Sequence, residues 1–317
     1  MTDKISQINN INMRIPKVRG IIRKNFELSR LSWLKVGGPA EIFFQPEDED
    51  DLSFFLKNLE TNIPIFVIGA CSNLIIRDGG IPGVVIKLGK NFSTIKLNKT
   101  VVSVGAACRD SYLAQTCAKE GVDLSFLRTI PGNLGGAVKM NAGCYGSYLS
   151  DYLIGITLIR RDGSITNMNV RDLKFSYRNS TIPDDAIITN VLLKKELDDP
   201  LRIEMKMTRA LDIRNLSQPI KELSCGSTFR NPLGRSSLED KYDSDHSLKA
   251  WKLIDDAGLR GTKVGGAMVS KKHTNFLINT GNATAKDIED LGNFVIKKVK
   301  KNSGIDLIWE VKRVGRY

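Results

Sequence analysis

The chain has 317 residues, of which 41% are hydrophobic and 26% are charged, and its formal net charge is +12. This length allows about two to three domains with a sizeable core, and no apolar run approaches the roughly 20 residues needed to cross a bilayer. Residues 1–14 are polar and lack the apolar block of a secretion signal. We therefore expect a cytoplasmic protein without membrane insertion.

The cysteine and histidine content and the net charge limit which ligands and partners we expect the protein to bind. The five cysteines form no Cys-x-x-Cys pair and only two histidines are present, so we expect free thiols and no metal site. A positive chain favours anionic partners. Lys and Arg are nevertheless spread along the chain, apart from a cluster at 297–301, and no nucleic-acid module is recognisable. An anionic small molecule or dinucleotide fits the charge equally well, and a lysine-rich solvated surface is the alternative.

Strands and helices follow one another without a regular repeat. In the first half, hydrophobic patterning predicts strands at 41–44, 63–68, 74–77, 84–88 and 101–104, a helix after Pro46 and a second helix over 110–120. In the second half it predicts a hairpin of 154–160 with 165–170, a strand at 186–193, helices over 203–216 and after Thr284, and a closing strand at 307–314. This mixture indicates an α+β fold with more than one domain.

Two glycine-rich stretches are candidate anion sites. Residues 130–146 carry five glycines, one proline and no acidic residue. Glycine is placed where the backbone turns with positive φ or approaches a group closely, and exposed amides without a carboxylate suit a pyrophosphate. Residues 69–73 form a second small-residue loop that leaves a buried strand. Taken alone, either stretch could instead be a loop that only links two elements.

An ordered set of polar motifs accompanies these loops. They are 33–38 (WLKVGG), 69–73 (GACSN), 130–146 (IPGNLGGAVKMNAGCYG), 177–180 (YRNS), 226–232 (GSTFRNP), 257–261 (AGLRG), 265–273 (GGAMVSKKH) and 309–311 (WEV). From about Ser32 to the C-terminus, this collinear set resembles the UDP-N-acetylenolpyruvoylglucosamine reductase family.

The resemblance implies a fold and a reaction. It implies an FAD-binding module of the vanillyl-alcohol-oxidase/PCMH type, with one α+β subdomain at 1–90 and a second at 91–208. A C-terminal α+β substrate-binding domain would follow at 209–303, and a C-terminal strand at 304–317 would carry Glu310. FAD would be bound tightly but non-covalently, and NADPH would be the co-substrate. The chain, expected to be a monomer, would reduce the enolpyruvyl group of a UDP-sugar to UDP-N-acetylmuramate, a precursor of peptidoglycan.

The resemblance also implies cofactor-binding residues. In family positions of the two loops stand Gly69, Cys71, Ser72, Asn73, Ile130, Pro131, Gly132, Gly135, Gly136, Asn141, Ala142, Gly143 and Tyr145. The chain departs from the family at Ala70 and Cys71, where glycines are usual. The extra Cβ atoms could crowd a pyrophosphate unless the loop geometry adapts.

Three residues match the family's catalytic positions. Hydride addition pushes negative charge into the substrate carboxylate, and preorganised positive and proton-donating groups should be aimed at that charge. Arg178 would clamp the carboxylate, Glu310 would hold or share a proton, and Ser227 would deliver a proton to the carbon that bears the carboxylate. The alternatives are a surface arginine, an edge-strand carboxylate and a solvated loop serine.

Substrate contacts are carried over to four further residues, Tyr177, Asn231, Lys271 and His273. A satisfied structural histidine is at least as good an interpretation of His273. The stretch 234–251 is longer than the family's usual link and carries mixed charge, so lid behaviour or a partner contact stays open there.

Two other functions remain in view. Another FAD oxidoreductase of the same fold would share the glycine-rich loops but would not need Ser227, Asn231 and Glu310 in this order. A catalytically silent nucleotide-sugar or nucleic-acid binder would use the basic surface instead. The retained catalytic set argues against silence, because a binder has no need of Ser227 or Glu310.

Overall fold

The computed structural model describes residues 14–144, 146–232 and 248–317. Its first sheet has the order β1-β2-β5-β3, from β1 (Ile21–Glu27), β2 (Pro39–Gln45), β5 (Ile81–Lys87) and β3 (Ile65–Ile68). β1 is antiparallel to β2, whereas β2 and β3 run parallel to β5. Helix α1 (Glu49–Asn58) begins at Asp48, whose side chain accepts a hydrogen bond from the amide of Asp51, and Phe55 packs on Phe44 of β2.

The second sheet is antiparallel throughout. Its order is β11-β10-β14-β7-β6, from β11 (Ile165–Asn169), β10 (Leu153–Ile159), β14 (Ile187–Lys194), β7 (Val101–Gly105) and β6 (Ile95–Leu97). Helices α2 (Asp110–Lys119), α3 (Leu134–Lys139) and α5 (Pro200–Ser217) contribute apolar side chains to the same core. Short elements connect them: β8 (Gly143–Cys144), β9 (Ser147–Tyr148), α4 (Leu149–Tyr152), β12 (Phe175–Ser176) and β13 (Asn179–Ser180).

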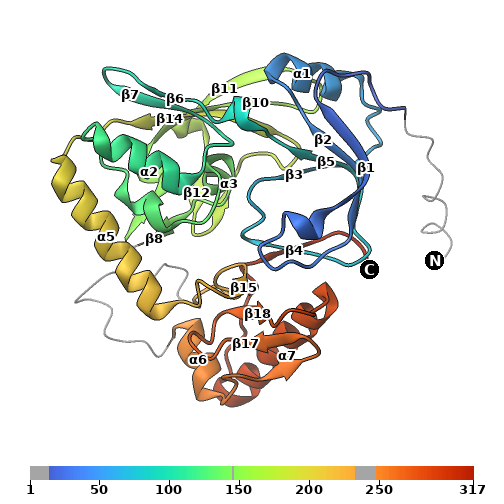
Figure 1. The fold of residues 1–317 in the computed structure, drawn as a ribbon, viewed down its shortest axis with the longest axis vertical. Helices are drawn as coiled ribbons and strands as arrows, with labels where there is room; N and C mark the ends of the chain where they lie inside the picture. Colours follow the sequence, from blue (N-terminus) through green and yellow to red (C-terminus); the bar gives the residue numbers. More distant parts are fainter. Residues whose placement is uncertain (1–13, 145, 233–247) are drawn as a thin grey trace.

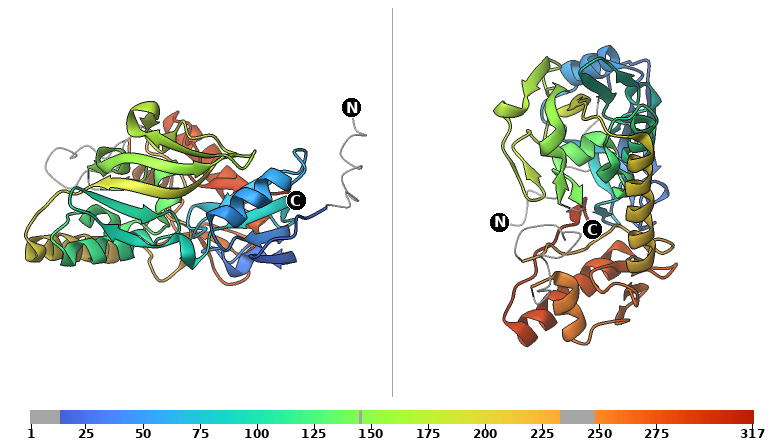
Figure 2. Two further views of the ribbon diagram at one scale, coloured as in Figure 1. Left: turned by 90° about the horizontal axis from the view of Figure 1, so that it is seen from above. Right: turned by 90° about the vertical axis from the view of Figure 1, so that its left-hand side faces the viewer.

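A third, C-terminal region has its own sheet, and its core also takes in Leu34, Val36 and Ile75 from the first part of the chain. The sheet order is β15-β18-β17-β16, from β15 (Leu223–Ser224), β18 (Leu277–Asn279), β17 (Ala267–Val269) and β16 (Lys263–Val264). Helices α6 (Ala250–Asp256) and α7 (Ala285–Ser303) join its core. Figure 1 shows this region below the two larger sheets, and Figure 2 shows α5 running from the second sheet down to it.

The chain returns to its first part at its end. β19 (Lys312–Val314) pairs in parallel with β4 (Leu74–Ile76), beside the first sheet (Figure 1). The C-terminal region therefore lies between two connections to the rest of the molecule. None of the described helices is long and apolar enough to span a membrane.

The predicted elements are of the right type, helix or strand, but several of them begin or end at residues other than those predicted. The α+β mixture is confirmed, and the helix after Thr284 begins with the predicted capping box, in which Thr284 and Asp287 exchange hydrogen bonds. The predicted closing strand 307–314 is wrong in length, because only Lys312–Val314 pairs as a strand. The predicted domain limit between 208 and 209 falls inside α5, whose Ala210 is buried. Residues 233–247, most of the long stretch in the C-terminal region, lie outside the described residues.

Several elements were missed in the sequence, among them β1, β6, α3 and the strands β15 to β18 of the C-terminal sheet. Helix α3 occupies the centre of the glycine-rich stretch, although Gly135 and Gly136 lower its intrinsic helix propensity. All five cysteines are free, as predicted.

Candidate active site

The two glycine-rich loops, residues 69–73 and 130–146, lie close together in the structure. A Cβ built on Gly69 would lie 3.3 Å from Oδ1 of Asn133, and one built on Gly132 would lie 4.0 Å from Oγ of Ser72. The predicted loops, far apart in the sequence, are therefore brought together by the fold.

Residues 132–135 are hydrogen-bonded to the segment that joins β7 to α2. The amides of Leu134 and Gly135 donate to the carbonyls of Cys108 and Ala106, each at 2.9 Å. A Cβ on Gly135 would come within 3.0 Å of the Ala106 Cβ, so this close approach favours glycine. By contrast, Gly136 is exposed and its Cβ would meet nothing within 4 Å. An open backbone at this point fits a dinucleotide phosphate.

Cys71 adopts the left-handed region, with a φ of 54°. Its side chain is only 3% exposed and packs in the core with Ile68, Ile76 and Val85. The Cβ of Cys71 therefore points into the protein. It does not crowd the space expected for a pyrophosphate, although the family usually has a glycine at this position. Burial raises the pKa of the thiol to about 11, so it stays protonated at neutral pH.

Residues 141–143 connect the second loop to the predicted catalytic arginine. Oδ1 of Asn141 accepts from the amide of Ser150 at 3.1 Å, and its Nδ2 donates to the carbonyl of Ser176 at 3.3 Å. The carbonyl of Gly143 accepts from Nη2 of Arg178 at 3.1 Å. Tyr145 lies outside the described residues.

Arg178 lies at the turn between β12 and β13, where its φ of 55° is again left-handed. Its Nε donates to Oε1 of Glu310 at 2.8 Å, and the two side chains are 16% and 12% exposed. Burial lowers the pKa of Arg178, but the Glu310 carboxylate more than offsets this and the pKa is raised overall. Nη1 of Arg178 is buried without a hydrogen-bond partner in the described parts of the chain.

Ser227 and Glu310 come from segments that pair with each other. The amide of Glu310 donates to the carbonyl of Thr228 at 2.8 Å, and Phe229 and Trp309 form an isolated β-bridge. The loop is further fixed by Asn275, whose carbonyl accepts from Thr228 N at 2.7 Å. The fold thus unites all three predicted catalytic residues, which lie far apart along the chain.

Tyr177 approaches the same carboxylate. Its hydroxyl lies 3.4 Å from Oε2 of Glu310. Burial, followed by the charge of Glu310, raises the pKa of Tyr177 to about 12. The hydroxyl is therefore a neutral donor throughout the physiological range.

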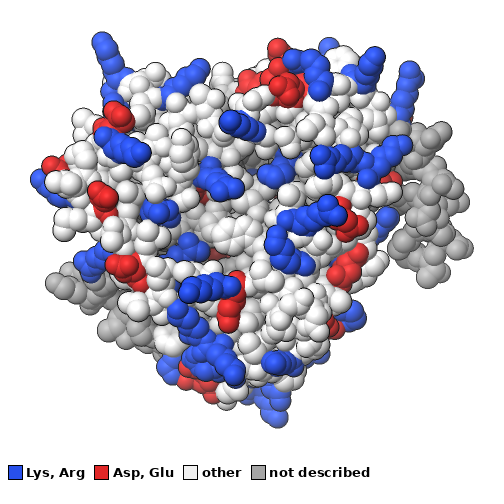
Figure 3. Space-filling view, in the orientation of Figure 1, with Lys and Arg blue, Asp and Glu red and all other residues white. Residues whose placement is uncertain are grey.

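A pocket of about 490 Å³ adjoins Arg178. Its lining includes the basic side chains Lys139, Arg178, Arg230 and Lys312 and the single acid Asp184. Nε of Arg230 is buried without a partner among the described residues. Figure 3 shows that the face drawn there is hollowed near its centre, with basic side chains around the hollow. Such a lining suits an anionic ligand.

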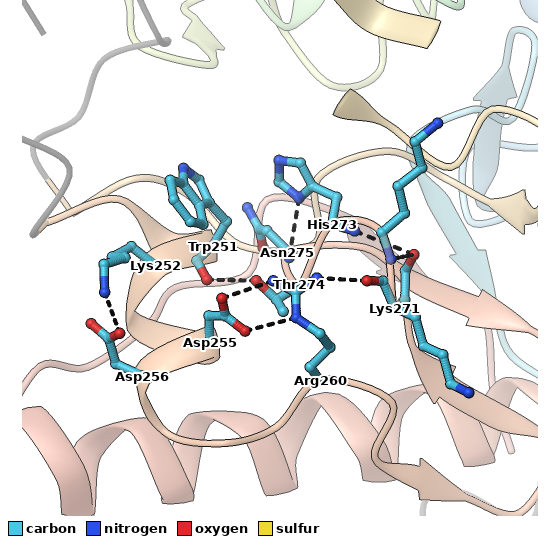
Figure 4. A network of polar contacts seen from close by, with 11 residues as sticks. Trp251, Lys252, Asp255, Asp256, Arg260, Lys271, His273, Thr274 and Asn275 are labelled. Atoms are coloured by element: carbon cyan, nitrogen blue, oxygen red, sulfur yellow. Dashed lines mark hydrogen bonds and ion pairs between the residues drawn. The ribbon is translucent and has the colours of Figure 1, made fainter. Parts of the chain in front are cut away.

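The other predicted substrate contacts, of which Figure 4 shows Lys271 and His273, form hydrogen bonds and packing contacts with residues of the C-terminal region. Nδ1 of His273 accepts from the amide of Asn275 at 3.3 Å, and its ring packs against Phe276 at a centroid distance of 4.8 Å. Burial lowers the pKa of His273 to about 4. The stem of Lys271 lies against Gly261, and Oδ1 of Asn231 accepts from Ala250 N at 3.2 Å.

Several residues near the site were missed in the sequence. They are Lys87 and Arg109 beside the glycine-rich loops, the fully buried Asp110 below Gly132, and Asn275 behind the Ser227 loop. None belongs to a glycine-rich or polar motif, and only the three-dimensional packing shows their place.

The fold and the site define a class, the FAD-binding oxidoreductases with an added C-terminal domain. A model of the FAD binding domain matches residues 40–169, and a model of the UDP-N-acetylenolpyruvoylglucosamine reductase C-terminal domain matches residues 218–314. The chain is 50% identical to the UDP-N-acetylenolpyruvoylglucosamine reductase of Paracoccus denitrificans over 302 residues, which are 95% of this chain and 98% of that protein. It is likewise 50% identical to the Roseobacter denitrificans protein of that name over 301 residues, 95% of this chain and 97% of that protein.

A solved structure agrees with these relatives. The crystal structure of the reductase from Thermus caldophilus superposes with a TM-score of 0.77 at 33% identity, covering 94% of this chain and all of that one. The chain belongs to the UDP-N-acetylenolpyruvoylglucosamine reductase family. The resemblance drawn from the motifs is thereby confirmed, together with the expected FAD-binding module and C-terminal domain.

Proposed function

We propose that this chain reduces the enolpyruvyl group of UDP-N-acetyl-3-O-(1-carboxyvinyl)-glucosamine to UDP-N-acetylmuramate, with FAD as bound cofactor and NADPH as co-substrate. The observation that carries this proposal is the meeting of Arg178, Glu310 and the Ser227 loop beside a basic pocket. We further propose that the protein acts in the cytoplasm as a monomer.

The cofactor site is proposed between the two glycine-rich loops. We assign to it Gly69, Cys71, Ser72, Asn73, Ile130, Pro131, Gly132, Gly135, Gly136, Asn141, Ala142, Gly143 and Tyr145. The open backbone at Gly136 and the inward-facing Cys71 side chain support this assignment. Bound FAD supplies the hydride that NADPH provides and the substrate receives.

Arg178 is proposed to bind the substrate carboxylate. Its planar fork is occupied by Glu310 through Nε, while Nη1 has no partner among the described residues. A carboxylate could therefore add to the free donor or displace Glu310 from the fork. Either arrangement places the charge that develops during reduction against a guanidinium and a neutral Tyr177 hydroxyl.

Ser227 and Glu310 are proposed to take part in the proton transfer to the substrate. The pairing of Thr228 with Glu310 keeps the two residues on adjacent segments. Ser227 would give its proton to the carbon that bears the carboxylate, and Glu310, in a protonated or proton-sharing form, would stabilise the charge on the carboxylate oxygens. Asn275 acts as a positioning residue for this loop, because its carbonyl and side chain hold Thr228 and Phe229.

The nucleotide sugar is proposed to enter the basic pocket. Lys139, Arg230 and Lys312 surround space suited to its phosphates, and Tyr177 lies at the catalytic end. We retain Asn231, Lys271 and His273 as proposed substrate contacts at the C-terminal side. For domain limits we propose an FAD-binding module to residue 217, with subdomains meeting near residue 90, followed by the substrate domain and the strand that carries Glu310.

The test is anaerobic oxidation of NADPH by the purified yellow protein, with and without the enolpyruvyl UDP-sugar. Wild type should be reduced by NADPH and reoxidised by the sugar. Ser227→Ala should keep flavin reduction, while turnover falls about 10²–10⁴-fold, the usual contribution of general acid catalysis. Flavin reduction without consumption of the sugar would indicate another flavin oxidoreductase. A joint loss of flavin and turnover in Ser227→Ala would make Ser227 structural.

A further inference from the structure

Two cations stand where the glycine-rich loops touch. Lys87 ends β5, and its partner in the ladder with β3 is Ile68, the residue before Gly69. Arg109 precedes α2 and forms an isolated β-bridge with Asn133. Gly69 and Asn133 are themselves in contact, since a Cβ on Gly69 would lie 3.3 Å from Oδ1 of Asn133. Lys87 and Arg109 therefore flank a single point of the proposed cofactor site.

Neither cation has a counter-charge among the residues that the structure describes. In the described ranges, no hydrogen bond or ion pair is formed by the side chain of Lys87 or Arg109. Burial lowers the pKa of Lys87; Cys71 opposes this shift, and the charge of Arg109 adds to it. Two like charges are thus held within range of each other, which costs stability unless an anion joins them.

The nearest acid does not supply that anion. Asp110 follows Arg109 directly, but its side chain is fully buried and its Oδ2 lies 2.8 Å from the place of a Gly132 Cβ. Neither carboxyl oxygen has a hydrogen-bond partner among the described residues, and burial raises the pKa of Asp110 well above its usual range. In the described parts of the chain no ion pair joins Asp110 to Lys87 or Arg109, so it does not balance their charges.

We infer that Lys87 and Arg109 bind the diphosphate of the dinucleotide held between the two loops. The inference rests on the proposed cofactor site. The guanidinium of Arg109 offers a planar fork for one phosphate, and Lys87 offers a compact charge for phosphate oxygens. The loop amides contribute additional donors. The two cations contact neither the flavin ring nor the reacting carbon in this assignment, so they are binding residues and not catalytic residues.

The test compares flavins that differ in phosphate content. Lys87→Met keeps the aliphatic stem, Arg109→Gln keeps a polar side chain, and the double variant removes both charges. Dissociation constants are measured for FAD, FMN and riboflavin by flavin fluorescence on the full-length protein freed of flavin. Each single change should raise the Kd for FAD about tenfold or more, the scale of a charge-assisted hydrogen bond. The Kd for riboflavin should not change, and the dependence of FAD binding on salt should weaken.

Stability separates a binding role from a structural role. If the charges serve the ligand, the flavin-free variants should melt at the same temperature as wild type or above it, because burial and repulsion are relieved. Lys90→Met, an exposed lysine three residues beyond Lys87, is the matched control and should leave flavin binding unchanged.

Two results would overturn the inference: unchanged FAD affinity in the double variant, or an equal loss for riboflavin and FAD together with a lower melting temperature. Wild-type protein that takes up no FAD would instead end the proposed function.

Discussion

Nε of Arg178 donates to Oε1 of Glu310 at 2.8 Å and joins two residues that are 132 positions apart. The bond links the turn of the two-stranded β12–β13 sheet with the segment that leads into β19. Glu310 therefore occupies one edge of the guanidinium that we assign to the substrate carboxylate.

Glu310→Gln should separate binding from chemistry. Glutamine keeps the shape but has no charge for Arg178 and no acidic proton, so kcat should fall about 10²–10³-fold, as for other groups that stabilise developing charge. KM for the nucleotide sugar should stay equal or decrease, because Arg178 no longer has a carboxylate partner within the protein. Steady-state kinetics with saturating NADPH measure both constants. A kcat within tenfold of wild type would contradict the role of Glu310.

Gly292→Ala should damage the site from a distance. A Cβ at this position of α7 would lie 2.1 Å from the ring of Trp309, the neighbour of Glu310. Alanine is the better helix former by about 1 kcal/mol, yet we expect lower stability and lower kcat because the indole must move. Thermal melting and turnover test this. Asn293→Ala, on the exposed side of the same helix, is the control and should change neither.

Asp110→Asn should stabilise the flavin-free protein above acidic pH. A carboxyl whose pKa is raised by folding contributes stability below its unfolded pKa of about 3.9, and this contribution is lost as the pH rises through the folded value. The Tm of the variant should exceed that of wild type at pH 8, and the difference should shrink toward pH 4. A lower Tm at pH 8 would show that the carboxyl has a partner in solution.

Asp51→Asn is the matched comparison. Asp51 is also a buried aspartate in the first turn of a helix, but it accepts from the amides of Arg19, Gly20 and Glu47 at 2.8–3.0 Å. Removing one acceptor oxygen should cost about 1–3 kcal/mol. Opposite signs at Asp110 and Asp51 would show that hydrogen-bond satisfaction, and not burial, decides the effect.

His273 should make stability fall in acid. Its pKa is lowered by folding from about 6.5 to about 4, so the unfolded chain binds the extra proton between these values and stability is lost as the pH drops through them. His273→Gln should flatten this part of the stability curve. Chemical denaturation at several pH values between 4 and 7 measures it. An unchanged slope would mean that His273 is solvated.

Local patterns predicted much of the fold and the centre of the site. The capping residues at Thr284 and Asp287 mark the start of α7, and the glycine-rich stretches mark both loops, whereas the catalytic roles of Arg178, Ser227 and Glu310 are proposed from the family resemblance. These signals are contiguous in the chain. What depends on distant packing was missed: α3 forms because 134–135 docks on the carbonyls of Cys108 and Ala106, although its glycines disfavour a helix.

The same limit applies to Lys87 and Arg109. One ends a strand and the other precedes a helix, and neither stands in a recognisable motif. Lys87 and Arg109 come to the same part of the molecule through the ladder between β3 and β5 and the bridge between Arg109 and Asn133. These pairings cannot be recognised in a sequence pattern. Arg178, Ser227 and Glu310, by contrast, were proposed from the resemblance to a family, which needs no three-dimensional information.

The return of β19 to β4 limits how the C-terminal region can move. α5 and β19 tether the region twice, and further contacts hold it to the first part of the chain: Arg77 pairs with Glu289 of α7 at 2.8 Å, and Asp78 accepts from the amides of Ala285 and Lys286. Glu310 lies just before the second tether. We therefore expect Glu310 to keep its place as substrate comes and goes, because its segment is held on one side by pairing with Thr228 and Phe229 and on the other by β19.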